Sequence, residues 1–184
     1  MCQSAFRLLH DAWLWICSAR TINVLHLERV RRATHTPLSI RTMAAPAVAA
    51  PVASCIFCSI VAGKIPCIKL TETAHSIAFM DIYPISKGHC LVVPKVHAAK
   101  LHEVTDEVIA DVAVTMRRVA AAAGAENYNV LQNNGELAHQ AVHHVHFHII
   151  PKTSEADGLG FVWPAAAGDK AALQSLADDI KSRL

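Results

Sequence analysis

Three histidines alternate with apolar residues in the chain, at His144, His146 and His148, with Val145 and Phe147 between them. Side chains two positions apart point to the same face of a β-strand. The pattern therefore predicts a strand over residues 144–150 with one imidazole-lined face and one apolar face in the core. Same-face neighbours on a strand lie about 6.6–6.8 Å apart, so three imidazoles at that spacing predict a functional site.

Such a row of imidazoles admits three interpretations. One neutral ring can attack phosphorus or carbon while its neighbours set its tautomer and hold charge. Alternate histidines on a strand can also bind zinc, or they can be structural or solvated residues without a function. Glu136 is the only carboxylate close upstream of the row, and hydrolytic metal centres usually mix carboxylates with histidines. The scarcity of carboxylates around the row favours a nucleophilic histidine over a hydrolytic metal centre.

Cys55 and Cys58 form a C-x-x-C pair that also has several interpretations. The pair can contribute to a zinc site, form a redox couple, or consist of two buried thiols that pack as small apolar groups. No thioredoxin-like βαβ pattern surrounds it, which disfavours the redox couple. Zinc binding and plain packing both stay open at this point.

Length, charge and hydropathy limit the class of protein. The 184 residues suffice for one domain with a tail, and 53% of them are hydrophobic. From residue 43 onward the chain has 11 basic and 13 acidic residues. It therefore lacks the excess of positive charge that is typical of nucleic-acid-binding domains. No run of eighteen apolar residues occurs, so we expect no membrane span. The six cysteines form no small-domain disulfide framework, which favours a reduced compartment.

Residues 1–53 are expected to be a disordered N-terminal extension outside the folded domain. Residues 1–42 hold six arginines and no lysine against Asp11 and Glu28, a composition that is typical of an organelle transit peptide. Alternatively, Met43 is the true initiator, and the preceding residues are upstream sequence that is not part of the protein. The expected compartment is mitochondrial in the first case and cytoplasmic in the second.

The elements that must position the histidines are readable from residue 55 onward. Acidic residues at 106 and 107 begin a helix, an apolar stripe continues it, and Gly124 ends it. Strands outnumber helices and occur in hairpins, so the predicted class is α+β with an antiparallel sheet, a central helix and a C-terminal helix. The expected helices cover 55–62, 105–124 and about 173–184, and the expected strands cover 67–72, 76–80, 89–93, 128–132 and 144–150.

Four separate motifs resemble the histidine triad family. Asn133–Pro151 resembles its signature of three alternating histidines. Cys55–Cys58 with Ile65-Pro66 resembles the family's opening, Phe79–Pro84 its ribose loop, and Gly88–His97 its central strand. The resemblance covers about residues 54–184, which we expect to form one histidine triad domain.

Within the family, the chain resembles the nucleotide-binding branch, and Ala138-His139-Gln140 is similar to its fungal-type subgroup. The resemblance implies a dimeric fold that binds purine mononucleotides and transfers a nucleotidyl group through a covalent histidine. It implies that His146 is the nucleophile, that His148 contacts phosphoryl oxygens and that His144 orients His146. His89 would complete the catalytic group from a neighbouring strand.

The resemblance also implies a nucleotide-binding set. Asp81 matches the family's ribose-binding carboxylate, although such a residue can also simply cap its own turn. The animal branch typically has serine at position 141 and glycine at position 139, so the leaving-group preference of this chain is open. The implied nucleotide-binding residues are Phe57, Asp81, Ile82, Asn133, His139, Gln140, Ala141 and His148.

In some family members two cysteines and two histidines form a structural zinc site, and here those residues are Cys55, Cys58, His97 and His144. A Cys₂His₂ set suits tetrahedral zinc. The resemblance further implies a symmetric homodimer, in which we expect Phe161 and Trp163 to be buried against the partner. Alternatively, the two aromatic residues form a lid on the sheet of their own chain.

The resemblance favours hydrolysis of adenosine phosphoramidates. Two alternatives remain: a dinucleoside polyphosphate hydrolase, and a nucleotide-binding regulatory partner whose catalysis is incidental.

Overall fold

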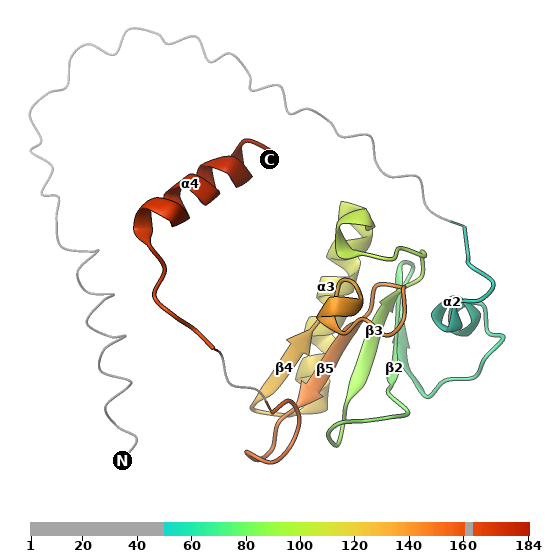
Figure 1. The fold of residues 1–184 in the computed structure, drawn as a ribbon. Coiled ribbons are helices and arrows are strands. Elements are labelled where there is room, and N and C mark those ends of the chain that lie inside the picture. The colour runs from blue at the N-terminus through green and yellow to red at the C-terminus, as the bar shows by residue number, and fades with distance from the viewer. Residues whose placement is uncertain (1–49, 161–163) are drawn as a thin grey trace, which may run out of the picture. The chain divides into compact units, whose positions relative to one another are not determined.

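The computed structural model describes residues 50–160 and 164–184 of the chain. The described part is α+β and contains one antiparallel five-stranded sheet, which confirms the predicted class (Figure 1). The helices are α2 (Ile56–Val61), α3 (Asp106–Ala123) and α4 (Lys170–Lys181), with two short 3₁₀ turns at Leu101–Glu103 and Glu136–Ala138. The strands are β1 (Lys69–Glu72), β2 (Ser76–Met80), β3 (Cys90–Pro94), β4 (Tyr128–Leu131) and β5 (Phe147–Pro151).

The strands lie in the order β1-β2-β3-β5-β4, so β3 is at the centre of the sheet. Alternation along β3 divides its side chains between two layers. Val92 belongs to a core cluster with residues of α3, whereas Leu91 and Val93 belong to a second cluster with Phe57 and Cys58 around α2. The two helices therefore cover opposite faces. Leu91 pairs with His148 of β5, which places the site histidines on the α2 face.

The central helix α3 begins and ends as its sequence predicts. Thr105 is the N-cap, Asp106 and Glu107 occupy the first turn, and Gly124 adopts a left-handed conformation with φ of 67° at the end. Negative charge near the N-terminus stabilises a helix, and glycine adopts positive φ without steric cost. Its apolar stripe is buried on the sheet, where full burial of one valine contributes about 1.5–3 kcal/mol; the stripe includes Val108, Val112 and Val119.

A polar cluster fixes the β1–β2 turn against α3. One carboxylate oxygen of Asp111 accepts hydrogen bonds from the hydroxyls of Thr73, at 2.7 Å, and of Ser76, at 2.6 Å. The Ser76 hydroxyl also lies 3.0 Å from the hydroxyl of Thr115. Ser76 and Thr115 are buried, and mutual hydrogen bonding offsets the cost of removing these groups from water.

The predicted histidine strand is too long at its N-terminal end. β5 begins at Phe147, so only His148 of the three histidines lies in the sheet ladder. The backbone N–H of Val145 donates to the carbonyl of Ala98 at 2.8 Å, and that of His144 donates to Val142. These bonds hold the chain in an irregular path before the strand. The apolar half of the prediction is confirmed, because Val145, Phe147 and Ile149 all lie in the core cluster beneath α3.

Several expectations fall on residues that the structure does not describe. The transit peptide, the choice of initiator and the compartment depend on residues 1–49, and the proposed aromatic contact depends on Phe161 and Trp163. α4 begins three residues earlier than expected and is capped by Asp169, whose carboxylate accepts from the N–H of Ala172. Within the described ranges, no helix combines the length and hydropathy that a membrane crossing requires.

Candidate active site and metal centre

His146 is held with a lone pair free for attack. Its Nδ1 lies 2.6 Å from the carbonyl oxygen of His144, and a carbonyl can only accept. Nδ1 therefore carries the proton, and in the neutral ring Nε2 carries the lone pair. Burial lowers the pKa of His146, against smaller opposing effects of the His144 carbonyl and of Asp81. The ring, only 5% exposed, is thus a neutral nucleophile at pH 7.

His148 and His89 form a second pair of imidazoles beside it. Nε2 of His89 lies 2.9 Å from Nδ1 of His148, and the His146 and His148 rings are 5.0 Å apart between centroids. The pKa of His148 is lowered to about 4, mainly by burial and to a smaller extent by the neighbouring His146 and His89 rings, against the opposing effect of Asp81. Burial also lowers the pKa of His89, and Asp81 opposes the shift. Both rings are neutral at pH 7.

Asp81 has two contacts, one within its own loop and one with the histidine group. One carboxylate oxygen accepts the N–H of Tyr83 at 2.8 Å, which caps the loop. The other oxygen lies 3.6 Å from Nε2 of His89. Asp81 is therefore both a loop cap and a member of the polar cluster, and its predicted contact with ribose stays untested.

Phe57 and Ile82, two of the residues implied to bind nucleotide, have different environments. Phe57 is buried, and its ring packs against His146 at 5.0 Å between centroids and against Phe79 at 6.0 Å. Ile82 is 69% exposed on the loop after Asp81. An exposed isoleucine on a loop has apolar surface available for a ligand, whereas Phe57 also stabilises the core beneath the histidines.

The loop before the histidines is braced by Gln140, whose side chain is only 3% exposed. Its amide oxygen accepts the N–H of Gly135 at 2.7 Å, and its amide nitrogen donates to the carbonyl of Ala99 at 2.7 Å. The Gln140 N–H donates to Gly135 as well. The structure thus places the polar groups of Gln140 in the loop itself, and its predicted contact with nucleotide stays untested.

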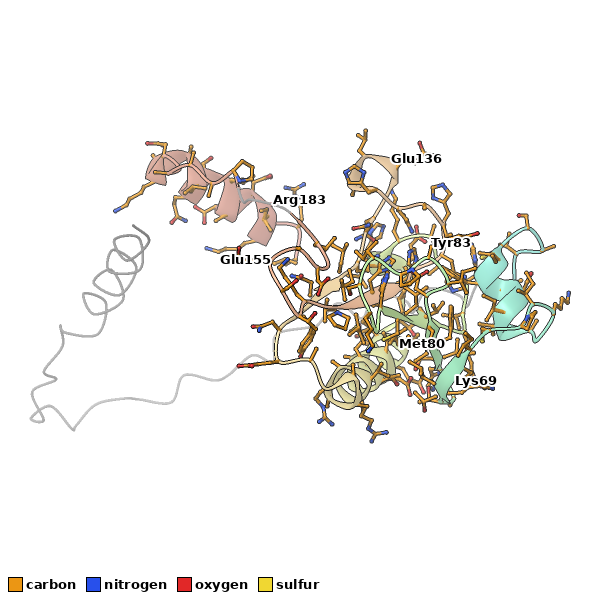
Figure 2. The ribbon with its side chains drawn as sticks, turned by 90° about the horizontal axis from the view of Figure 1, so that it is seen from below. Lys69, Met80, Tyr83, Glu136, Glu155 and Arg183 are labelled. Carbon is orange, nitrogen blue, oxygen red and sulfur yellow. The ribbon has the colours of Figure 1, made fainter. Side chains whose placement is uncertain are left out.

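The other predicted residues of this loop lie at its surface. His139 adopts a left-handed conformation with φ of 62°, and its carbonyl accepts a hydrogen bond from the Asn133 amide at 3.2 Å. Figure 2 shows the neighbouring Glu136 projecting from the body of the fold. Ala141 is exposed, and its N–H donates to no backbone carbonyl of the described residues. That N–H is free to bind an anionic group.

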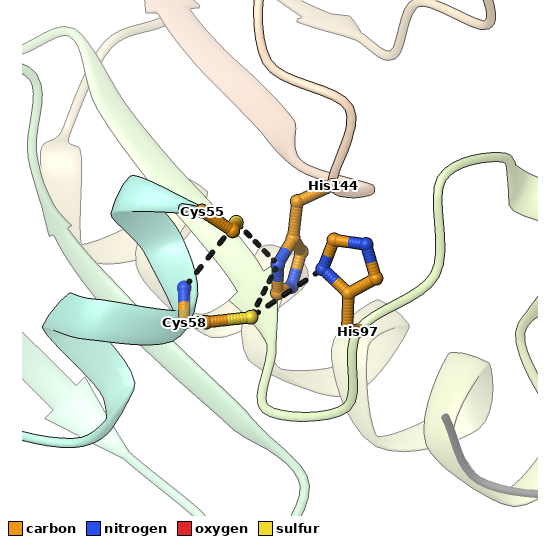
Figure 3. A group of neighbouring side chains, drawn as sticks. All are labelled: Cys55, Cys58, His97 and His144. Atoms are coloured by element: carbon orange, nitrogen blue, oxygen red, sulfur yellow. Dashed lines mark hydrogen bonds between the residues drawn. The ribbon is translucent and has the colours of Figure 1, made fainter. Parts of the chain in front are cut away.

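The structure brings Cys55, Cys58, His97 and His144 together beside α2 (Figure 3). Sγ of Cys55 lies 3.4 Å from Nδ1 of His144, and Sγ of Cys58 lies 3.6 Å from the same nitrogen. Sγ of Cys58 is also 3.4 Å from Nδ1 of His97. Tetrahedral zinc, with bonds of about 2.3 Å to sulfur and 2.0–2.1 Å to nitrogen, separates such ligand atoms by about 3.5 Å. The donor set and its spacing therefore fit zinc.

His144 already has the tautomer that a metal ligand needs. Its Nε2 lies 2.9 Å from the carbonyl oxygen of Pro94, so Nε2–H donates and Nδ1 presents a lone pair to the two thiols. A backbone carbonyl bound to the distal N–H is the usual support of a metal-binding histidine. The C-x-x-C spacing and His97 were readable in the sequence, but the Pro94 carbonyl was not, because no side-chain pattern marks it.

Comparisons with known proteins identify the family of the chain. The sequence model of the HIT (histidine triad) domain matches residues 62–155. The chain is 57% identical over 131 residues to adenosine 5'-monophosphoramidase of Schizosaccharomyces pombe, and the alignment covers 71% of this chain and 98% of that protein. It is 47% identical over 147 residues to adenosine 5'-monophosphoramidase of Saccharomyces cerevisiae, and the alignment covers 80% of this chain and 92% of that protein.

Solved structures give the same result. A histidine triad nucleotide-binding protein of Candida albicans matches with a TM-score of 0.68 and 46% identity, over 71% of this chain and 96% of that one. A hypothetical protein of Leishmania major matches with a TM-score of 0.68 and 49% identity, over the same shares. The chain belongs to the histidine triad family. The predicted family and its fungal-type branch are confirmed.

Proposed function

We propose that the chain hydrolyses adenosine phosphoramidates through a covalent nucleotidyl-histidine at His146. The observation that carries the proposal is the hydrogen bond from His146 Nδ1–H to the His144 carbonyl, which leaves Nε2 as a buried, neutral nucleophile. Two relatives from yeasts are named adenosine 5'-monophosphoramidases. A neutral imidazole suits attack on an anionic phosphoryl group, because it adds no negative charge to the encounter.

The reaction has two displacements at phosphorus. Nε2 of His146 attacks, a bond from this nitrogen to phosphorus forms, and the bond from phosphorus to the leaving nitrogen breaks as that nitrogen takes a proton from solvent and departs as the amine. Water then attacks the same phosphorus and releases a proton to solvent, the bond from Nε2 to phosphorus breaks, and His146 leaves as a neutral ring. His148 donates to a phosphoryl oxygen throughout, and the free N–H of Ala141 supports the developing charge. Asp81 accepts from the ribose.

A turnover assay separates this function from its alternatives. We expect an adenosine phosphoramidate to be hydrolysed to AMP much faster than a diadenosine polyphosphate. Preference for the dinucleotide would instead identify a polyphosphate hydrolase. Binding of AMP without turnover of either compound would leave the regulatory, nucleotide-binding function and contradict the proposed one.

The Cys₂His₂ cluster is proposed to hold one structural zinc ion. The support is the spacing of the four ligand atoms, which all lie within 4.8 Å of one another, and the tautomer of His144. Bound zinc would supply conformational constraint rather than reaction chemistry. Four protein ligands would fill its tetrahedral coordination and leave no open position for substrate.

The chain is further proposed to form a symmetric homodimer through the β4 edge of the sheet. Among the residues that the structure describes, β4 pairs on one side only, with β5, and it exposes 46% of Tyr128 and 50% of Val130. An exposed apolar edge strand is a template for pairing with a second chain, and two-fold dimers are the commonest closed assemblies. Light scattering at micromolar concentration tests this, and a monomer would contradict it.

A further inference from the structure

The two imidazoles nearest the proposed reaction need to present opposite groups to the substrate. His146 must offer a lone pair to phosphorus. His148 must offer an N–H to a phosphoryl oxygen, because a lone pair directed at that anionic oxygen would repel it. The His144 carbonyl fixes the first ring. The second ring contacts no carbonyl in the described part of the chain, and the group that faces it is His89.

A directed chain of hydrogen bonds leads to His148. The backbone N–H of Ile85 lies 3.3 Å from Nδ1 of His89, and a backbone N–H can only donate. Nδ1 of His89 is therefore the acceptor, and its proton is on Nε2. That Nε2–H faces Nδ1 of His148 at 2.9 Å, so Nδ1 of His148 accepts and Nε2 of His148 carries the proton.

Asp81 supports the same proton position. Its free carboxylate oxygen lies 3.6 Å from Nε2 of His89, and a nearby negative charge favours the tautomer with the N–H on that side. Asp81, His89 and His148 also place their ligand atoms within 4.8 Å of one another. A cation shared by both rings would need lone pairs at both facing nitrogens. The 2.9 Å contact instead needs a proton between them, so the group is a hydrogen-bonded chain.

We propose that His89 is a positioning residue that makes His148 a hydrogen-bond donor to the substrate. The inference rests on the proposed function for the identity of the acceptor, but the tautomers themselves belong to the free protein. His89 acts through His148 and the Ile85 N–H, and it does not touch phosphorus or the leaving group. Through the Ile85 N–H, the loop that follows Asp81 thereby sets the proton position on His148.

The direct test is ¹⁵N NMR of the histidine side chains in the free, zinc-loaded protein at pH 7. We expect His148 and His89 each to show an N–H signal at Nε2 and an unprotonated Nδ1, and His146 to show the reverse. A protonated Nδ1 on His148 would overturn the proposal. The measurement needs no turnover, so it tests the tautomers even if the proposed function is wrong.

Variants then connect the tautomer to activity. In His89→Leu the donor is lost, and we expect His148 to populate both tautomers and kcat/KM for an adenosine phosphoramidate to fall roughly 10- to 100-fold. His89→Gln restores an N–H donor, and we expect it to recover the His148 Nε2–H signal and most of the activity. His75→Leu is the matched control, because His75 pairs with Glu107 at the surface of α3.

The outcomes are distinguishable even where His89→Leu folds poorly. His89→Gln with a restored signal but without recovered activity would overturn the positioning role, and so would His89→Leu with full activity. An inactive wild-type protein with the expected tautomers would contradict the proposed function alone.

Discussion

The carbonyl oxygen of His144 lies 2.6 Å from Nδ1 of His146, while the ring of His144 faces the thiols of Cys55 and Cys58. One residue thus belongs to the proposed zinc cluster through its side chain and contacts the proposed nucleophile through its backbone carbonyl. Anything that fixes the His144 ring also fixes the carbonyl on which the tautomer of His146 depends. The orientation of His146, the proposed nucleophile, therefore depends on the proposed zinc cluster through His144.

This coupling predicts the effect of losing the metal. Cys58→Ser should abolish stoichiometric zinc, lower the melting temperature by at least about 6 °C, and reduce kcat by about 10-fold as His146 loses orientation. Elemental analysis, calorimetry and steady-state kinetics measure the three quantities. Cys67→Ser is the matched control, since Cys67 lies outside the cluster. Wild-type protein that lacks zinc after expression in zinc-containing medium would contradict the metal assignment.

Stability should fall in mild acid because the site histidines are kept neutral. Burial lowers the pKa of His148 to about 4 from 6.5, and the pKa values of His89 and His146 are also lowered. Between pH 6.5 and 4 the unfolded chain therefore binds more protons than the folded one, so the free energy of unfolding decreases as pH falls through this window.

Urea unfolding of the zinc-loaded protein at several pH values from 7.5 to 4.5 measures this slope. His148→Asn should make the dependence shallower. A free energy of unfolding that stays constant or rises as pH falls would show that these rings are not held neutral.

Gln140 is predicted to act on the loop rather than on the nucleotide. In Gln140→Ala the partly buried N–H of Gly135 and carbonyl of Ala99 lose their partners, which should lower the free energy of unfolding by about 1–2 kcal/mol. Unfolding and AMP-binding measurements separate the two roles, with Glu136→Ala as a surface control on the same loop. Weaker AMP binding at unchanged stability would instead assign Gln140 to the nucleotide.

The sequence predicted the parts of the fold that local patterns encode. The acidic first turn and Gly124 marked the bounds of α3, and alternation marked Val145, Phe147 and Ile149 as core residues. The late start of the histidine strand, at Phe147 rather than His144, was not predictable. It depends on the carbonyl of Ala98, which is distant in sequence. The role of Gln140 was hidden for the same reason, since its partner is Ala99.

For the site, residue types were sufficient to propose the members but not their tautomers. The histidines and cysteines could be assembled by family resemblance. The carbonyls of Pro94 and His144 and the N–H of Ile85, which determine where each proton sits, belong to the backbone. Their positions follow only from the folded chain.

The central claim is that His146 becomes covalently nucleotidylated, and acid-quench mass spectrometry during turnover of an adenosine phosphoramidate tests it most directly. His146→Asn, which retains an N–H for the His144 carbonyl, should bind AMP but lose at least about a thousandfold in turnover and form no adduct. The account predicts an AMP adduct on wild-type His146 and on no other residue. An adduct on a different residue, or turnover in His146→Asn near the wild-type rate, would contradict it.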